Sequence, residues 1–167
     1  MNDLIAKHPM DSVRFTKPVR APDDIHFLTR DEQIRFLEVA KRSHNYNQYA
    51  LILETGLRTG EMIGLTWDAI DFEKRTLTVN KTLEYRHKQH FWRAGPPKTQ
   101  QSYRTIPLTD RAYEILKEIK DKRPWQKESP LLWQTLEYID RRTGAISRLV
   151  MRDLVFINWR TGEPAKN

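Results

Sequence analysis

The stretch TGLRTGE, residues 55–61, ends one helical pattern and starts another. The run before it, NYNQYALILE, is apolar nearly all round and predicts a buried helix over about 46–55. Gly56 suits the left-handed C-terminal cap of that helix, and Thr59 suits the N-cap of another, short helix. Arg58 therefore lies in the break, held rigidly by a helix on each side.

The position of Arg58 has a chemical consequence. Its guanidinium is expected to point away from the core, close to the N-terminal N–H groups of the short helix, where it can bind a phosphate with a bidentate fork. Glu61 follows in the first helical turn and is close enough to hold the guanidinium in position. The alternative is an ordinary surface ion pair, in which Glu61 only complements the helix dipole.

Helices and strands are both predicted along the rest of the chain. The capping box TRDE has Thr29 as its N-cap and begins a helix that ends near Arg42. WDAID, FEKR and TLTVN predict strand, turn and strand, and YRTIPL at 103–108 predicts a third strand. Thr109 is expected to cap a helix over 110–122.

Shorter segments complete this outline. The polar stretch 84–101 is expected to be an extended hairpin connection, while LEYID, RRTG and ISRLV predict a small hairpin and LVFIN a last buried strand. Residues 1–28, with prolines at positions 9, 18 and 22, indicate a linker or arm. The predicted fold class is α+β, in which helices pack with a small antiparallel three-stranded sheet.

The composition limits the possible functions. The 167 residues make one domain by length, and 29 Lys and Arg against 22 Asp and Glu give a net charge of +7, which suits a polyanionic partner. The sequence has no cysteine, and its five histidines lack metal-ligand spacing apart from His87 and His90, so no metal is expected. No apolar run approaches the ~20 residues of a membrane span, and we expect a cytoplasmic protein.

Basic residues gather between positions 81 and 104, where there are six of them against the single acid Glu84. The six are Lys81, Arg86, Lys88, Arg93, Lys98 and Arg104. Aromatic residues are interleaved with them, namely Tyr85, Phe91, Trp92 and Tyr103. A projecting hairpin with this pattern suits the phosphate backbone of a nucleic acid. The alternative is a solvated, charged edge that discourages aggregation between sheets.

Lys98 is set apart from the other basic residues by its neighbours. It follows two prolines and precedes a polar turn in PPKTQQSYRTIPL, so it is expected at the tip of a hairpin. A lysine on a rigid hairpin can be pressed into a site and donate a proton to a leaving oxygen. The alternative is an ordinary surface charge.

Taken together, these stretches resemble the catalytic domain of tyrosine recombinases, also called phage integrases. TGLRTGEMIGLTWDAID resembles the family's first arginine box, and KTQQSYRTIPL its β-hairpin lysine followed by an Arg-hydrophobic-Pro strand. LVFINWRTGEP resembles a later strand and turn, so the likeness covers residues 29–164. The amino-acid sequence around the basic segment is most similar to that of integrases of conjugative transposons from Gram-positive bacteria.

The resemblance implies a role for each of the candidate residues. In this family a tyrosine attacks the scissile DNA phosphate and forms a 3′-phosphotyrosyl link, with no metal or nucleotide cofactor. Arg58 matches the first catalytic arginine, which stabilises charge on the phosphate, and Glu61 matches the acid that supports it. Lys98 matches the lysine that protonates the 5′-oxygen. Contacts to double-stranded DNA are expected from Lys81, Arg86, Lys88, Arg93, Thr99 and Arg104.

The match stops short of the family's second box, a His-x-x-Arg that is followed by the nucleophilic tyrosine. HFWR at 90–93 spells His-x-x-Arg but precedes Lys98, and is interpreted as a chance match. Residues 29–167 therefore resemble the N-terminal part of the catalytic domain, and residues 1–28 a linker from a missing core-binding domain.

Three expectations about activity follow from this partial match. The chain alone is expected neither to cleave nor to rejoin DNA. The full-length protein would carry out site-specific recombination and integration, with self-association on DNA and association with the nucleoid. The alternative is a non-catalytic DNA-binding or protein-interaction module derived from an integrase, which needs neither Arg58 nor Lys98.

Overall fold

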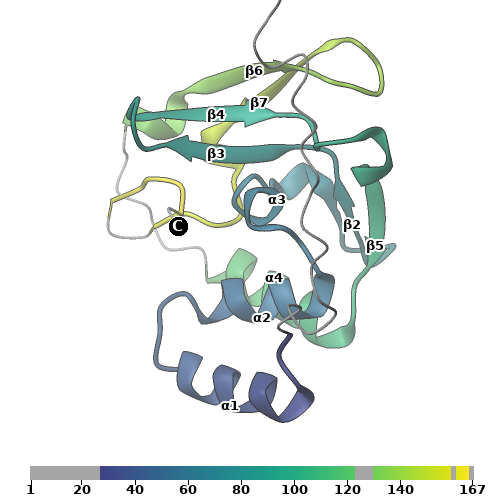
Figure 1. Cartoon of the computed structure of the whole chain (residues 1–167), viewed down its shortest axis with the longest axis vertical. Coiled ribbons are helices and arrows are strands. Elements are labelled where there is room, and N and C mark those ends of the chain that lie inside the picture. Colours follow the sequence, from purple (N-terminus) through teal and green to yellow (C-terminus); the bar gives the residue numbers. More distant parts are fainter. Residues whose placement is uncertain (1–26, 123–129, 159–160, 166–167) are drawn as a thin grey trace, which may run out of the picture. The chain divides into compact units, whose positions relative to one another are not determined.

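The computed structural model describes residues 27–122, 130–158 and 161–165 (Figure 1). Contacts divide the chain into two units, Met1–Ile34 and Arg35–Asn167. The predicted arm, residues 1–28, lies outside the described residues except for its last two. Among the described helices, none is both long and apolar enough to cross a bilayer.

The first two helices lie close to their predicted positions. Helix α1 spans Arg30–Ala40 and is capped by Thr29. The Thr29 hydroxyl accepts the backbone N–H of Glu32 at 3.4 Å, and the backbone N–H of Thr29 donates to the Glu32 carboxylate at 2.8 Å. Helix α2 spans Tyr46–Thr55 and ends at Gly56, whose φ of 64° lies in the left-handed region. The predicted capping box and the predicted glycine cap are therefore confirmed.

Helix α3 (Thr59–Ile63) has a different N-cap from the one that the sequence suggested. Arg58, with an extended backbone (φ −70°, ψ 153°), occupies the N-cap position, and Thr59 is the first helical residue. The reason is the carboxylate of Glu61, whose Oε2 accepts the backbone N–H of Arg58 at 2.9 Å. This bond ties the backbone that carries the Arg58 guanidinium to the first turn of α3.

The predicted three-stranded antiparallel sheet is present, in the order β1-β2-β5. Its strands are β1 (Ile70–Asp71), β2 (Thr76–Val79) and β5 (Arg104–Pro107). Leu77 in β2 is paired with a residue of each neighbouring strand and is fully buried. The apolar residues at the centre of this sheet therefore belong to the hydrophobic core.

Helix α4 (Asp110–Asp121) follows β5 directly. Its N-cap is Thr109, as predicted, since the Thr109 hydroxyl accepts the backbone N–H of Ala112 at 3.1 Å. The fully buried Leu116 of α4 and Leu51 of α2 both belong to the same core cluster. The helices thus cover the apolar side chains of the sheet, which is the α+β arrangement expected from the sequence.

The segment predicted to be a polar connection, 84–101, instead contributes to a second sheet. Strands β3 (Thr82–Arg86) and β4 (Phe91–Gly95) pair in antiparallel register. Leu83, Trp92 and Ala94 are buried, so one face of this hairpin is apolar although its composition is basic. Charged residues on the exposed face mask the alternation that marks a strand.

Lys98 does not lie at a hairpin tip. Because β2 pairs with β5 and β3 pairs with β4, the two sheets form the two halves of one long hairpin that bends between them (Figure 1). Lys98 belongs to the loop 96–103, which joins β4 to β5 on one side of this bend. The tip is the turn between β3 and β4, where His90 adopts a φ of 53°.

The last part of the chain holds one confirmed hairpin and one prediction that is wrong. Strands β6 (Thr135–Ile139) and β7 (Ile146–Val150) form the predicted small hairpin. In LVFIN, residues 154–156 are buried, but the segment forms no strand of a sheet in the described residues. The backbone N–H of Val155 donates to Leu65 O at 2.8 Å, and Leu154 and Ile157 each make one isolated bridge. The apolar character of LVFIN therefore reflects core packing and does not indicate a ladder of strand hydrogen bonds.

Candidate active site

Arg58 and Glu61 form the centre of the candidate site. The Arg58 side chain is 66% exposed, whereas that of Glu61 is only 2% exposed. Nη1 of Arg58 donates to Glu61 Oε1 at 2.9 Å, in addition to the backbone bond that Arg58 makes to the other carboxylate oxygen. Arg58 is therefore held at its backbone and at its guanidinium, while most of its side chain remains open to solvent.

A second arginine, Arg104 of β5, shares the same carboxylate. Its Nη2 lies 2.7 Å from Glu61 Oε2 and its Nη1 lies 3.1 Å from Oε1, a bidentate pair. Arg104 also donates to Ser102 O at 3.2 Å and to Gly56 O at 3.5 Å. The sequence predicts Arg104 to be a DNA contact of the basic segment, but its guanidinium is turned toward Glu61. Nothing in the sequence signals this pairing, because the two residues are 43 positions apart.

The charges of this cluster are well defined. Burial alone would raise the pKa of Glu61, but the hydrogen bonds from Arg104 and Arg58 outweigh burial and hold its pKa below the ordinary value. Hydrogen bonding to the same carboxylate raises the pKa of Arg104. Two guanidiniums and one carboxylate leave one surplus positive charge, and Arg58 is the more exposed of the two cations. An anion can therefore be bound at Arg58 without first breaking the Glu61–Arg104 pair.

The loop that carries Lys98 is connected to this cluster by hydrogen bonds. Lys98 is exposed, while Pro97 before it is fully buried and anchors the chain. Thr99 and Ser102 bond to each other through their hydroxyls at 2.9 Å and through the Ser102 N–H and Thr99 O at 3.1 Å. Since Arg104 bonds Ser102 O, a continuous path leads from Arg58 through Glu61 to the loop of Lys98.

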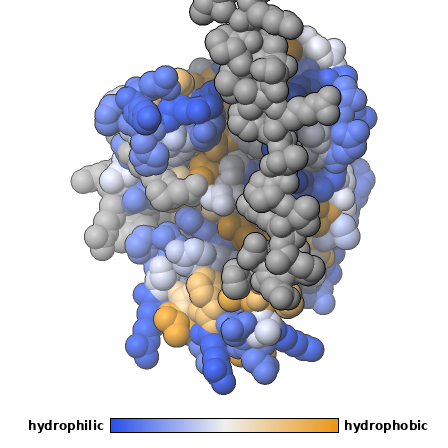
Figure 2. Space-filling model, in the orientation of Figure 1, coloured by the Kyte–Doolittle hydropathy of each residue, from blue (hydrophilic) through white to orange (hydrophobic). Residues whose placement is uncertain are grey.

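Not all of the predicted basic surface is exposed. Lys88 lies in the turn of the β3–β4 hairpin and Arg93 in β4, and both are exposed, whereas Arg86 is half-buried and pairs with Glu84 at 3.1 Å. Figure 2 shows hydrophilic surface at the upper left, over the tip of this hairpin. HFWR lies in this turn and in β4, not on a helix as the family's second box requires.

Lys81 is buried, contrary to the expectation of a projecting cation. Only 7% of the residue is exposed, and its Nζ donates to Thr66 Oγ1 at 2.5 Å and to Asp68 Oδ1 at 3.2 Å. Partial burial would raise the pKa of Asp68, but the hydrogen bond from Thr66 and the charge of Lys81 lower it. The Asp68 side chain is 71% exposed, so only the Lys81 end of this ion pair is buried. Asp68 supplies the opposite charge that a buried ammonium needs.

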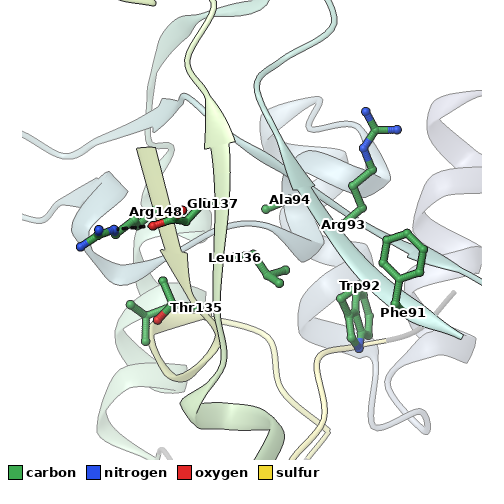
Figure 3. A pocket seen from close by; sticks show the side chains of 9 residues that line it. Phe91, Trp92, Arg93, Ala94, Thr135, Leu136, Glu137 and Arg148 are labelled. Atoms are coloured by element: carbon green, nitrogen blue, oxygen red, sulfur yellow. Dashed lines mark hydrogen bonds and ion pairs between the residues drawn. The ribbon is translucent and has the colours of Figure 1, made fainter. Parts of the chain in front are cut away.

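A groove separates β4 from the β6–β7 hairpin (Figure 3). Ala94 and Trp92 line it from β4, and Leu136 lines it from β6. Arg93 extends away from Leu136, so its guanidinium is available at the surface (Figure 3). Within the described ranges, no group of three or more His, Cys, Asp or Glu side chains could hold a metal ion.

Comparisons with known proteins agree with this arrangement. The phage integrase family model matches residues 26–155. The chain is 32% identical to a tyrosine recombinase XerC-like protein of Caldanaerobacter subterraneus subsp. tengcongensis, over 74% of this chain and 34% of that protein. It is 31% identical to the transposase of transposon Tn916 from Enterococcus faecalis, over 71% of this chain and 30% of that protein. The chain thus spans about a third of the length of these relatives.

Solved structures share the fold. The Tn1549 transposon integrase, in complex with circular intermediate DNA, superposes with a TM-score of 0.61 at 24% identity, over 83% of this chain and 40% of that one. The XerA recombinase gives a TM-score of 0.53 at 17% identity, over 90% of this chain and 40% of that one. The family model covers more than half of the residues, including the Arg58 box and the Lys98 loop. The chain therefore belongs to the phage integrase family, the tyrosine recombinases.

Proposed function

We propose that this chain supplies the N-terminal part of the catalytic domain of a tyrosine recombinase, which breaks and rejoins double-stranded DNA at specific sites during integration. The observation that carries the proposal is the exposed guanidinium of Arg58, fixed by a buried carboxylate and linked by hydrogen bonds to the loop of Lys98. A rigid guanidinium and an exposed ammonium on a connected loop suit a reacting phosphodiester. The Tn1549 integrase, whose fold is similar, was solved with DNA, which supports a DNA substrate.

Each residue has a distinct role in the proposed reaction. Arg58 binds a non-bridging oxygen of the scissile phosphate and stabilises the charge that develops there. Glu61 holds Arg58 and Arg104 in position and does not touch the substrate. A tyrosine attacks the phosphorus, the bond to the 5′-oxygen breaks, and Lys98 gives that oxygen its proton. Lys88, Arg93 and Thr99 bind the flanking backbone, with Arg86 as a further contact once Glu84 releases it.

The complete recombinase has further parts and properties. Residues 1–28 act as the linker from a core-binding domain that encloses the DNA. The complete recombinase self-associates on paired DNA sites and works in the cytoplasm, at the nucleoid.

The 167-residue chain is expected to form no covalent link to DNA. Six tyrosines are present, and none follows a His-x-x-Arg helix as the nucleophile of this family does. A nicked suicide substrate traps the phosphotyrosyl intermediate, and a denaturing gel detects it. A complete tyrosine recombinase serves as the positive control. A slow-migrating, protease-sensitive DNA band with the 167-residue chain alone would show that one of its own tyrosines is the nucleophile.

DNA binding by the chain is expected to be salt-sensitive and centred on the β3–β4 hairpin. Reversing both exposed charges, Lys88→Glu with Arg93→Glu, should weaken binding about tenfold or more and reduce the slope of log K against log salt by about 2. The matched control reverses Lys74 and Lys117, two exposed lysines outside the segment, and changes the net charge equally. Fluorescence anisotropy at several salt concentrations measures both effects. If both double variants lose the same amount of DNA affinity, the interface lies elsewhere. A DNA affinity that does not change with salt concentration would favour a protein-interaction module.

A further inference from the structure

The turn of the β6–β7 hairpin is held rigid by its own hydrogen bonds. Oδ1 of Asp140 accepts the backbone N–H of Arg142 at 2.7 Å and that of Thr143 at 2.9 Å. The N–H of Gly144, at a φ of 70°, donates to Asp140 O at 2.8 Å. A short aspartate-capped turn of this kind presents its remaining backbone groups at fixed positions. The groups that it presents are the backbone N–H and C=O of Arg141, whose partners lie outside the turn.

Both of these Arg141 backbone groups bind the loop of Lys98. The N–H of Arg141 donates to the Tyr103 hydroxyl at 3.1 Å, and Nε2 of Gln100 donates to Arg141 O at 3.3 Å. Gln100 begins the short 3₁₀ turn Gln100–Ser102, and Tyr103 follows it directly. The β6–β7 turn therefore bonds to both ends of the 3₁₀ turn that follows Lys98. Figure 1 shows the end of this hairpin beside the connection between β4 and β5.

The titration behaviour of the two elements agrees with this contact. Burial raises the pKa of Tyr103, and so do the hydrogen bond to Asp140 and the charge of that carboxylate, although the Arg141 N–H acts in the opposite direction. Burial would raise the pKa of Asp140, but the turn's backbone N–H groups and the Tyr103 hydroxyl lower it. The phenol thus stays neutral and the carboxylate stays charged at neutral pH, which keeps both hydrogen-bonding patterns intact.

The Lys98 loop is consequently tied down on two sides by different parts of the fold. On one side Arg104 bonds Ser102 O and belongs to the Glu61 cluster. On the other side Tyr103 bonds the β6–β7 turn. Lys98 lies just before both ties, after the buried Pro97. Fixing the backbone on both sides limits the positions that the Lys98 ammonium can occupy. A proton donor that is restricted to fewer positions near the reacting oxygen has a higher effective concentration there.

We propose that the β6–β7 turn is a latch that positions the Lys98 loop, and that Tyr103 is a positioning residue of the recombinase. The hydroxyl of Tyr103 and the backbone of Arg141 make the latch; neither touches the DNA phosphate. The catalytic consequence rests on the proposed role of Lys98 as proton donor, whereas the restraint of the loop does not. The restraint of the loop and its effect on proton donation by Lys98 can therefore be tested separately.

Hydrogen exchange at the Ser102 amide tests the restraint in the 167-residue chain. This N–H donates to Thr99 O, so its exchange rate reports opening of the loop. Tyr103→Phe removes the hydroxyl but keeps the ring, and should raise the exchange rate about three- to tenfold. Gln100→Ala should act in the same direction. Arg141→Ala is the matched control and should leave the rate unchanged, because the latch uses the Arg141 backbone. An unchanged rate in Tyr103→Phe would overturn the proposal.

Cleavage by the complete recombinase tests the catalytic consequence. Lys98→Ala and Tyr103→Phe should both slow cleavage of a suicide substrate, the latter about three- to tenfold. A substrate with sulfur at the 5′-bridging position has a leaving group that needs no proton, so both defects should disappear. Equal slowing of Tyr103→Phe on both substrates would contradict a positioning role. Failure of the sulfur substrate to rescue Lys98→Ala would instead disprove the proton-donor role and leave the exchange result standing.

Discussion

Replacing Glu61 with alanine is expected to lower the free energy of unfolding by about 2–3 kcal/mol. The carboxylate is almost fully buried and satisfies hydrogen-bond donors from two arginines and one backbone N–H. Its removal leaves Arg104, whose side chain is only 30% exposed, without its charge partner. Breaking a fully buried pair costs more, and the partial exposure of Arg104 reduces the penalty. Urea unfolding followed by circular dichroism gives this value.

A surface pair provides the control for Glu61. Glu118 forms an exposed ion pair with Lys122 on α4, so Glu118→Ala should change stability by about 0.5 kcal/mol or less. If Glu61→Ala costs no more than Glu118→Ala, the Glu61 cluster does not organise the fold around Arg58. Recombination by the complete protein should also fall in Glu61→Ala, since Arg58 loses the group that orients it.

The Glu61 cluster also predicts how stability depends on pH. The folded-state pKa of Glu61 is lowered, so its contribution is complete above the unfolded pKa, about 4.3. The contribution is lost as the pH falls through the lower, folded pKa. Wild-type stability should therefore decline more steeply than that of Glu61→Gln below about pH 4.5. Parallel curves for the two proteins would show that Glu61 titrates as it does in the unfolded chain.

Gly64→Ala is expected to destabilise the protein by about 2–3 kcal/mol, through overpacking. A Cβ at this position would lie 2.7 Å from Leu83 N and 2.9 Å from Thr82 C, and both are backbone atoms of β3. The φ of Gly64 is −83°, which alanine adopts without strain, so the cost is purely steric. The chain at the end of α3 would have to move away from β3, and Arg58 at the start of this short helix would move with it.

Gly60, on the same helix, is the matched control. A Cβ there would meet Leu83 O at 3.4 Å, an ordinary contact, so Gly60→Ala should be close to neutral. Unfolding by urea and the DNA affinity of both variants should be measured together. Equal stability of the two variants would show that α3 does not need its close approach to β3.

Predictions that rest on neighbouring residues agree with the structure. Thr29, Gly56 and Thr109 cap helices as expected, because a cap is decided by groups that lie within four positions along the chain. The β6–β7 hairpin was equally visible, since its turn residues lie between two alternating strands. The N-cap of α3 is the exception, because the carboxylate of Glu61 bonds the backbone of Arg58.

Predictions that depended on which side chains are buried and which backbone segments pair were less successful. The hairpin β3–β4 was hidden by its charged outer face, although Leu83 and Trp92 alternate inward. LVFIN was interpreted as a strand because it is apolar, but burial in the core satisfies the same pattern without strand pairing. Hydrophobicity specifies that a side chain is buried, not which backbone partner it finds.

By itself, the sequence determined the family, the α+β class, the place of Arg58 in a helix break and that of Glu61 in the helical turn after it. It placed Lys98 at a hairpin tip, whereas the strand pairing places Lys98 in the loop between β4 and β5. Only the tertiary structure decided that Arg104 shares Glu61, that Lys81 is buried against Asp68, and that the β6–β7 turn bonds the loop of Lys98. The physical reason is the separation along the chain between the groups that interact. Helix caps and turns form between neighbours, whereas the pairing of a charge depends on which distant groups the packed core brings beside it and how much water it excludes.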